Sequence, residues 1–382
     1  MNVEQLLDGR RVCICGGSGG VGKTTTSAAI ALGMAARGAK VAVVTIDPAK
    51  RLANALGLEE LENEPRRVEP ARLLAAGAPE IRGELWAMML DPKRTFDELI
   101  DRVAPDPARA QEIKANRVYR ELSTAVSGSQ EFTAIAKLYD LDRDGDFDLL
   151  VLDTPPSRNA LDFFDAPGRL TSFLEGRALK AFIRPTGLGM RVLGRGASPL
   201  LGALRRITGI DLLGDLSTFF TLLGDMTEDF SVRAAQVEKM LRAPTTAFML
   251  VTSAQSAPIE EAIWFRRTLQ ETGLPFAGVI VNRVHHDMLG DSTQDEVAPL
   301  LTAELGPELA AEVAANFHDY HALARRDERN IARLAAECDG EPLLLVPHLD
   351  DDVHDVEGLL RVQRFLFAPD GERELLLADV VA

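Results

Sequence analysis

Short apolar runs alternate with longer helical patterns along most of the chain. The apolar runs predict strands at residues 11–15, 40–46, 84–90, 148–152, 247–252, 276–281 and 343–346. Continuous rather than alternating hydrophobicity is typical of parallel strands that are covered by helices on both faces. We therefore expect an α/β fold with a doubly wound, mostly parallel sheet.

This alternation stops between residues 160 and 245, where helical patterns persist and no strand pattern occurs. Apolar residues recur there every three or four positions, which indicates one apolar helix face. They are Leu212, Leu216, Phe219, Leu223, Met226 and Phe230. The pattern predicts a helical subdomain at 161–244, inserted into a domain formed by 1–160 and 245–382. A smaller helical stretch is expected at 93–140.

Composition and charge narrow the class of protein. The chain has 382 residues, 46% hydrophobic and 26% charged, which is typical of a soluble protein. A formal net charge of -16 argues against a nucleic-acid partner. With Cys13, Cys15 and Cys338 as the only cysteines, no disulfide framework is expected. No signal peptide or membrane-spanning run is recognisable, so we expect a cytoplasmic protein.

A glycine-rich motif follows the first predicted strand and precedes an Ala-rich helix. It reads Gly17-Ser18-Gly19-Gly20-Val21-Gly22-Lys23-Thr24 and fits the phosphate-loop pattern G-x-x-x-x-G-K-[ST]. Glycines let backbone N–H groups turn toward phosphate oxygens, and the helix N-terminus adds positive potential. Lys23 is expected to reach the β- and γ-phosphates, and Thr24 to ligate Mg²⁺ directly. The motif predicts that 1–160 and 245–382 form a domain that binds ATP with Mg²⁺.

Two aspartates end predicted strands, where phosphoryl transfer commonly places its carboxylates. Asp153 ends an apolar run, so we expect it to hold Mg²⁺ through a water molecule. Asp47 precedes Pro48 and is expected to orient the attacking water, although either aspartate could instead belong to a turn. Catalysis is thus assigned to Asp47 and Lys23.

Together these segments resemble the ATPases of arsenite pumps and of tail-anchored-protein targeting, which have a deviant phosphate loop. The resemblance rests on Gly19 to Thr25, Asp47-Pro48-Ala49, Asp153-Thr154, Val281-Asn282-Arg283 and Val346-Pro347. It covers nearly the whole chain and implies ATP hydrolysis that switches a dimer. It also implies that Thr25 belongs to the loop, that Asn282 reads the adenine and that Pro347 lines its pocket.

The chain departs from that family at Ser18, where the deviant loop has a lysine that reaches the partner's nucleotide. Lys50 or Arg51 could supply the missing charge, or a paralogous partner could supply the lysine, so both a homodimer and a heterodimer are open. The family's metalloid-binding cysteines and zinc C-x-x-C pair have no counterpart here. The histidines lack ligand spacing, and we expect them on the solvated surface.

A basic stretch lies within the predicted insertion. Residues 169–206 contain eight basic residues and one acid, interleaved with large apolar residues. Three interpretations stay open: a lid that packs on its own core, a groove for a client or partner helix, and a membrane-surface contact. The partners considered are accordingly a membrane-protein client or a transporter, with membrane association only through such a partner.

The function expected is ATP hydrolysis that drives transport or client handling. One alternative is a partner subunit that binds ATP but hydrolyses it weakly, for which Ser18 is the reason. Another is an ATPase of the chromosome-partitioning type, because Asp153-Thr154-Pro155-Pro156-Ser157 also resembles that group. The acidic charge and the helical insertion argue against the second alternative.

Overall fold

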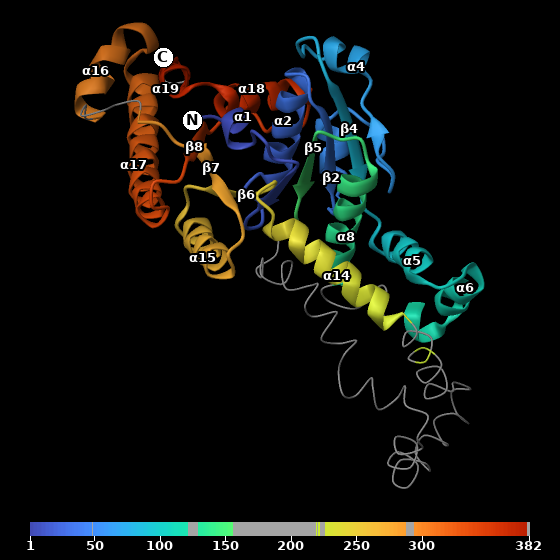
Figure 1. Ribbon diagram of the computed structural model, residues 1–382. Helices are drawn as coiled ribbons and strands as arrows, with labels where there is room; N and C mark the ends of the chain where they lie inside the picture. The colour runs from blue at the N-terminus through green and yellow to red at the C-terminus, as the bar shows by residue number, and fades with distance from the viewer. Residues whose placement is uncertain are drawn as a thin grey trace, which may run out of the picture. The chain divides into compact units, whose positions relative to one another are not determined.

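A sheet of eight strands organises the computed structural model, which describes residues 1–47, 49–120, 129–155, 219, 221, 226–287 and 294–379. The strand order is β3-β4-β2-β5-β1-β6-β7-β8 (Figure 1). The strands are β1 Val12–Gly16, β2 Lys40–Thr45, β3 Arg66–Arg67, β4 Glu84–Met89, β5 Leu149–Asp153, β6 Thr246–Ser253, β7 Phe276–Val284 and β8 Leu343–Pro347.

Every neighbouring pair of strands is parallel except β3 and β4, which are antiparallel. This confirms the expected α/β class and the mostly parallel sheet. All seven predicted strands are present, and the largest difference is at β7, which was predicted to end at 281 and ends at Val284. The central strands β1, β5 and β6 are buried along their whole length, which explains their unbroken hydrophobicity.

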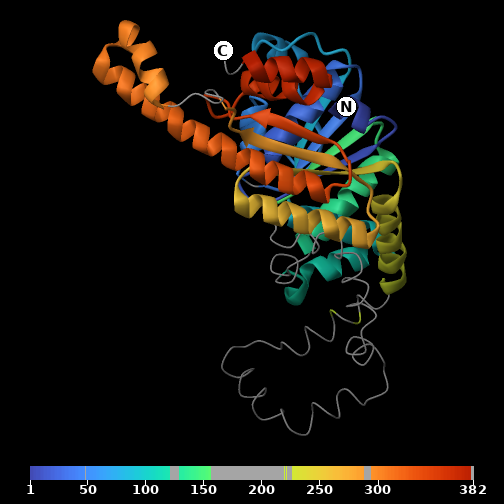
Figure 2. The ribbon, with the colours of Figure 1, turned by 90° about the vertical axis from the view of Figure 1, so that its left-hand side faces the viewer.

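Helices cover both faces of this sheet (Figure 2). On one face lie α1 Val3–Leu6, α2 Lys23–Ala36 and α18 Val356–Phe367, and on the other lie α15 Ser256–Thr272 and α17 Pro307–Glu337. Ile30 and Leu32 of α2 and Leu359 and Leu366 of α18 are fully buried in the main core. Burial of this apolar surface is what holds α2, and thus the loop before it, against the sheet.

A shorter helix precedes α17 and packs against it (Figure 1). That helix, α16 Gln294–Leu305, is joined to α17 through Gly306, whose φ is 76°. Further short helices beside the sheet domain's strands are α3 Arg51–Ala55, α4 Pro70–Ala75 and α19 Asp370–Asp379. Among the described helices, none combines the length and the apolar character needed to cross a membrane.

Contacts divide the chain into two compact units. The first comprises 1–89, 145–160 and 242–382 and carries the whole sheet. The second comprises 90–144 and 161–241. The stretch 93–140 was predicted to belong to the sheet domain, whereas its contacts group it with the second unit.

The second unit contains helices with a small apolar core of their own. Its helices include α5 Pro92–Val103, α6 Pro107–Ala115, α8 Ser129–Asp144 and most of α14 Thr227–Arg242. Phe219, Met226 and Phe230, from the predicted apolar helix face, are buried with Ile100 and Tyr119. Leu212, Leu216 and Leu223 and the basic stretch 169–206 lie outside the described residues. The domain boundary at 161–244 therefore stays a prediction.

Candidate nucleotide-binding site

The glycine-rich loop joins β1 to α2, and two of its glycines are needed for steric reasons. Gly17 has a φ of 154°, and a Cβ there would lie 2.0 Å from the Val251 carbonyl oxygen of β6. Gly22 has a φ of 95°, and a Cβ there would lie 2.3 Å from Nδ2 of Asn282. These positions therefore tolerate only glycine if the loop is to keep this path. Gly19 and Gly20 are exposed, and Val21 is buried in the main core.

Helix α2 begins at Lys23 directly after this loop, and Gly22 gives it no side-chain cap. The N–H groups of its first turn are therefore available to an anion. Lys23 is buried, and its Nζ donates to the carbonyl oxygen of Ser18 across the loop at 2.8 Å. Burial lowers the pKa of Lys23, while the nearby Asp153 and Asp47 charges oppose that shift. Thr25 is partly buried in the same turn.

Asp153 ends β5 and lies at the centre of a polar cluster. One of its carboxylate oxygens, Oδ2, accepts hydrogen bonds from the hydroxyls of Thr24 at 2.7 Å and Thr45 at 2.9 Å. The strand register explains this, because Asp153 is paired with Thr45 of β2 and with Cys15 of β1. The neighbouring Thr154 hydroxyl donates to the Cys15 carbonyl oxygen at 2.8 Å and fixes the end of the strand.

The second oxygen of Asp153, Oδ1, is buried and has no hydrogen-bond partner among the residues that the structure describes. The side chain is 1% exposed, and burial raises its pKa to about 6, against the opposing effect of Thr24 and Thr45. A buried carboxylate with an unmatched oxygen is costly unless a cation or donor completes it. Beside the Thr24 hydroxyl, this donor set fits Mg²⁺, which prefers oxygen ligands.

Asp47 follows β2 in a short turn. Its backbone N–H donates to the Thr45 hydroxyl at 3.2 Å, and its Oδ1 accepts from the Ala49 N–H at 3.0 Å. Its other oxygen lies 3.8 Å from Nε of Arg51. Because Asp47 acts electrostatically on both Lys23 and Asp153, its carboxylate belongs to the same polar cluster.

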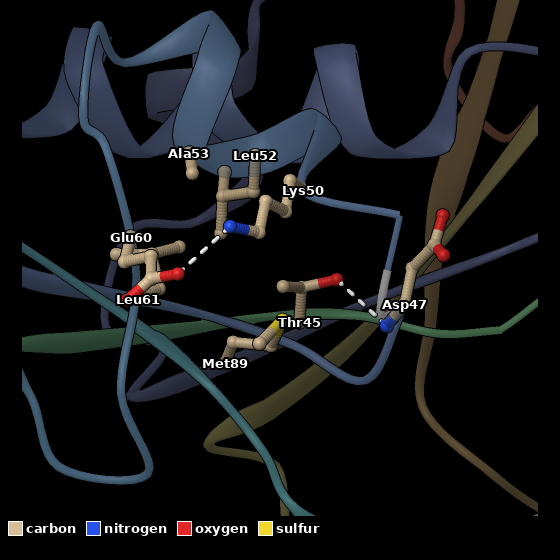
Figure 3. Close-up of a pocket in the computed structure, with 8 residues that line it drawn as sticks. All are labelled: Thr45, Asp47, Lys50, Leu52, Ala53, Glu60, Leu61 and Met89. Atoms are coloured by element: carbon tan, nitrogen blue, oxygen red, sulfur yellow. Dashed lines mark hydrogen bonds and ion pairs between the residues drawn. The ribbon is translucent and has the colours of Figure 1, made fainter.

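A pocket lies beside this turn (Figure 3). It has a volume of about 230 Å³ and is lined by Thr45, Asp47, Lys50, Leu52, Ala53, Glu60, Leu61 and Met89. The volume is below the range typical of sites for drug-sized ligands. Lys50 reaches Glu60 at 2.8 Å, and Figure 3 shows the Asp47 carboxylate pointing away from that pair. Both cations considered as substitutes at Ser18 are therefore engaged here, Lys50 by Glu60 and Arg51 by Asp47.

Ser18 is the second residue of the glycine-rich loop. Its hydroxyl is buried, and none of the described residues is within hydrogen-bonding reach of it. Its backbone carbonyl oxygen is the acceptor for Lys23. The serine therefore serves the loop through its backbone, and its side chain contributes no charge.

Asn282 and Pro347 lie on the other side of the loop, at the ends of β7 and β8. The Asn282 amide Nδ2 donates to the Val21 carbonyl oxygen at 3.0 Å, so this residue contacts the loop directly. Pro347 is paired with Val284.

Arg283 has a φ of 58°, and its guanidinium donates to the Gly20 carbonyl oxygen at 3.4 Å. No individual role was predicted for Arg283 or for Thr45, although both stand at strand ends.

The expectation of solvated histidines is wrong for three of them, one of which is His286 with its buried Nε2. His285 is 16% exposed in its side chain and lies 2.7 Å from the buried carboxylate of Asp327. His321 is 24% exposed and lies 2.8 Å from the carboxylate of Asp287. Cys13 and Cys15, in contrast, are fully buried in the core. Polarity in the sequence did not reveal the histidine contacts, because their partners are more than thirty residues away.

Comparison with known proteins identifies the family. Residues 10–323 match the family model of the anion-transporting ATPases. The chain is 28% identical over 211 residues to an ATPase GET3 of Mycosarcoma maydis, covering 54% of either protein. It is 26% identical over 278 residues to a putative arsenical pump-driving ATPase of Aquifex aeolicus, covering 72% of this chain and 63% of that protein.

A third relative is the ATPase get3 of Schizosaccharomyces pombe, 24% identical over 276 residues, with 70% of this chain and 72% of that protein covered. The chain thus spans about half of the Mycosarcoma maydis relative and less than two thirds of the Aquifex aeolicus one. The family match extends from the strand before the glycine-rich loop into α17 and includes every candidate site residue except Pro347. This chain therefore belongs to the anion-transporting ATPase family.

Proposed function

We propose that this protein binds ATP with Mg²⁺ at the loop 17–24 and hydrolyses the terminal phosphate bond. The observation that carries the proposal is the buried Asp153 carboxylate, which is bonded to Thr24 and has one unmatched oxygen. Family membership supports it, since the family and the relatives above are named as ATPases.

In this proposal each residue has a role that follows from its position in the site. Backbone N–H groups of the loop and of α2 bind phosphate oxygens, and Lys23 exchanges its contact with Ser18 for the phosphates. Thr24 would hold Mg²⁺ directly and Asp153 through a water molecule, and the bound ion would neutralise charge on the phosphate oxygens. Asp47 orients the attacking water and accepts its proton.

Ser18 bears on how the ATPase is organised. The Ser18 side chain is uncharged, and Lys50 and Arg51 are paired with carboxylates. Among the described residues, the cations that contact the loop are Lys23 and the exposed Arg283, and both bind its backbone carbonyl oxygens. Efficient hydrolysis then requires charge from a second subunit, as with an arginine finger. A dimer follows, either of this chain or with a paralogue that carries the signature lysine.

The cellular process that ATP hydrolysis drives is a separate proposal. The names of the relatives point to two different processes. One group is named after an arsenical pump and the other is named GET3. We favour nucleotide-driven switching that acts on a transporter or on a membrane-protein client in the cytoplasm. A weakly hydrolysing partner subunit is the alternative that Ser18 favours. An ATPase of the partitioning type is supported by the short resemblance at 153–157 alone.

The test is calorimetric titration of the purified chain with ATP in the presence of Mg²⁺. We expect binding by the wild type and a loss of about 100-fold or more in Lys23→Ala, because two charged hydrogen bonds disappear. Lys93→Ala, which removes an exposed lysine paired with Asp97, is the control and should bind normally. Undiminished affinity in Lys23→Ala would refute the assignment.

A further inference from the structure

Helix α17 buries two polar side chains at the carboxyl ends of β6 and β7, close to Asn282. Asp327 is 1% exposed and Asn330 is 6% exposed, although both lie in the middle of a helix of 31 residues. A helix that needed only to pack would bury apolar side chains here, since an unpaired buried carboxylate is costly. The burial of these two polar side chains is therefore explained by the groups to which they are hydrogen-bonded.

Asp327 holds the segment that leaves β7. Its Oδ2 accepts the backbone N–H of His285 at 3.1 Å and lies 2.7 Å from Nδ1 of the same histidine. Its Oδ1 accepts two hydrogen bonds from the guanidinium of Arg326, at 2.8 and 3.1 Å. Both carboxylate oxygens are thus used, and His285 is fixed through its backbone and its ring together.

His285 is also fixed from the next strand. Its ring lies 5.1 Å from that of His348 with an interplanar angle of 19°, so the two rings are stacked. The backbone N–H of His348 donates to the Val284 carbonyl oxygen at 2.9 Å. Because His348 directly follows Pro347, these contacts join the ends of β7 and β8, which are the strands of Asn282 and Pro347.

Asn330, one turn further along α17, holds the neighbouring strand end. Its Nδ2 donates to the carbonyl oxygen of Ala254 at 2.8 Å and reaches the Ser256 hydroxyl at 3.3 Å. Ala254 follows Ser253, which is paired with Asn282 in the sheet. The two buried polar residues of α17 therefore anchor the chain on both sides of Asn282.

We propose that Asp327 is a positioning residue for the base side of the nucleotide site. Through His285 it fixes the end of β7, so that the Asn282 amide stands between the glycine-rich loop and the base. Asn330 gives the same support from β6. This inference rests on the proposed binding of ATP and on the base lying beside Asn282 and Pro347, the placement that the resemblance in sequence implies.

A positioning role and a merely structural one differ in the ligands that they affect. Tripolyphosphate carries the phosphates of ATP without a base, and GTP carries a different base. Loss of Asp327 should weaken ATP binding about ten-fold, the scale of one lost hydrogen bond to a charged group, and should lower the preference for ATP over GTP. The affinity for tripolyphosphate should stay the same.

The experiment measures the affinities of ATP, GTP and tripolyphosphate with Mg²⁺ by calorimetry for four proteins. These are the wild type, Asp327→Ala, Asp327→Asn and Arg325→Ala. Asp327→Asn keeps an acceptor for the His285 N–H and should restore part of the ATP preference. Arg325→Ala removes an exposed ion pair with Glu328 on the same helix and should match the wild type.

Each outcome decides between the two proposals. If the wild type binds ATP no better than tripolyphosphate, the base contact beside Asn282 is refuted and this inference with it, while phosphate binding at the loop 17–24 stands. If the wild type prefers ATP and both Asp327 variants keep that preference in full, the positioning role is overturned. Equal losses for ATP and tripolyphosphate would also overturn it, since they would show general loosening of the fold. Should Asp327→Ala fail to fold, Asp327→Asn and His285→Phe carry the same comparison.

Discussion

The hydroxyl of Thr24 lies 2.7 Å from the carboxylate of Asp153, although 129 positions separate them in the sequence. The contact joins the first turn of α2 to the end of β5. Because Thr45 donates to the same oxygen, two neutral donors face a carboxylate that is buried and unmatched on its other side. Such an arrangement is poorly satisfied without a cation, and this has consequences that can be measured.

Without nucleotide and metal, Asp153→Asn should stabilise the protein near neutral pH. Burial raises the pKa of Asp153 from 3.8 to about 6, so the folded state binds this proton more tightly than the unfolded state does. The ionised form therefore costs stability, and that cost develops between pH 4 and 6 and is complete above 6. We expect a gain on the order of 1–3 kcal/mol at pH 7 and little gain at pH 4.

Denaturant unfolding at both pH values, compared between wild type and variant, measures this difference. Asp146→Asn is the control, because Asp146 is fully exposed. Adding Mg²⁺ and ATP should reverse the order, since only the wild type retains the carboxylate. A variant less stable than the wild type at pH 7 without ligand would contradict the prediction.

Asp47→Asn should retain ATP binding and lose turnover by about 100-fold or more, the usual contribution of a general base. The amide oxygen of asparagine can still accept the Ala49 N–H, so the turn should keep its shape. Steady-state hydrolysis and calorimetric titration measure the two properties separately. Arg51→Ala, which removes the cation near Asp47, controls for the loss of that ion pair. Parallel losses of binding and turnover would refute the assigned role.

Gly22→Ala should be far more damaging than Gly20→Ala. Both glycines have a positive φ, 95° and 78°, so either alanine costs about 1–2 kcal/mol of backbone strain. Only at Gly22 would the new Cβ meet another group, Nδ2 of Asn282, while at Gly20 nothing lies within 4 Å. We expect Gly22→Ala to lose the Asn282–Val21 hydrogen bond and with it ATP affinity. Equal ATP affinities for the two variants would show that Asn282 does not support the loop.

The sequence was sufficient for the elements that are decided locally. The strands β1, β5 and β6 are buried throughout and appear as unbroken apolar runs, and the glycine-rich loop has a fixed spacing. The strand β3 escaped detection because its two residues are exposed arginines at the sheet edge, paired only with β4. Its existence depends on a neighbouring strand, which no local pattern encodes.

In the candidate site, too, some residues could be predicted from the sequence and others could not. Asp153 could be found because it ends an apolar run, but Thr45 looked like any residue of a β-branched strand. Its hydrogen bond to Asp153 follows from the register between β2 and β5, which a single sequence does not reveal. The contact of His285 with Asp327 likewise depends on how α17 packs against β7. Tertiary contacts of this kind require the structure.

Ser18→Lys should allow this chain to hydrolyse ATP without a different, lysine-bearing partner. The serine hydroxyl has no partner among the described residues, so its replacement removes no hydrogen bond seen there, and the backbone acceptor for Lys23 is retained. A lysine that reaches a second copy would supply the missing charge, which in comparable transition states contributes about 10³-fold or more. Hydrolysis by the variant alone should rise by at least about ten-fold and depend on protein concentration.

Two further variants complete this comparison. Ser18→Ala should behave like the wild type, because it changes no charge. Lys50→Ala tests one other source of charge within the chain, and it should leave hydrolysis unchanged because Lys50 is paired with Glu60. If Ser18→Lys hydrolyses ATP no faster than Ser18→Ala while Lys50→Ala abolishes activity, the charge comes from Lys50. The need for a lysine-bearing partner would then disappear, since the turn after β2 would complete the site without one.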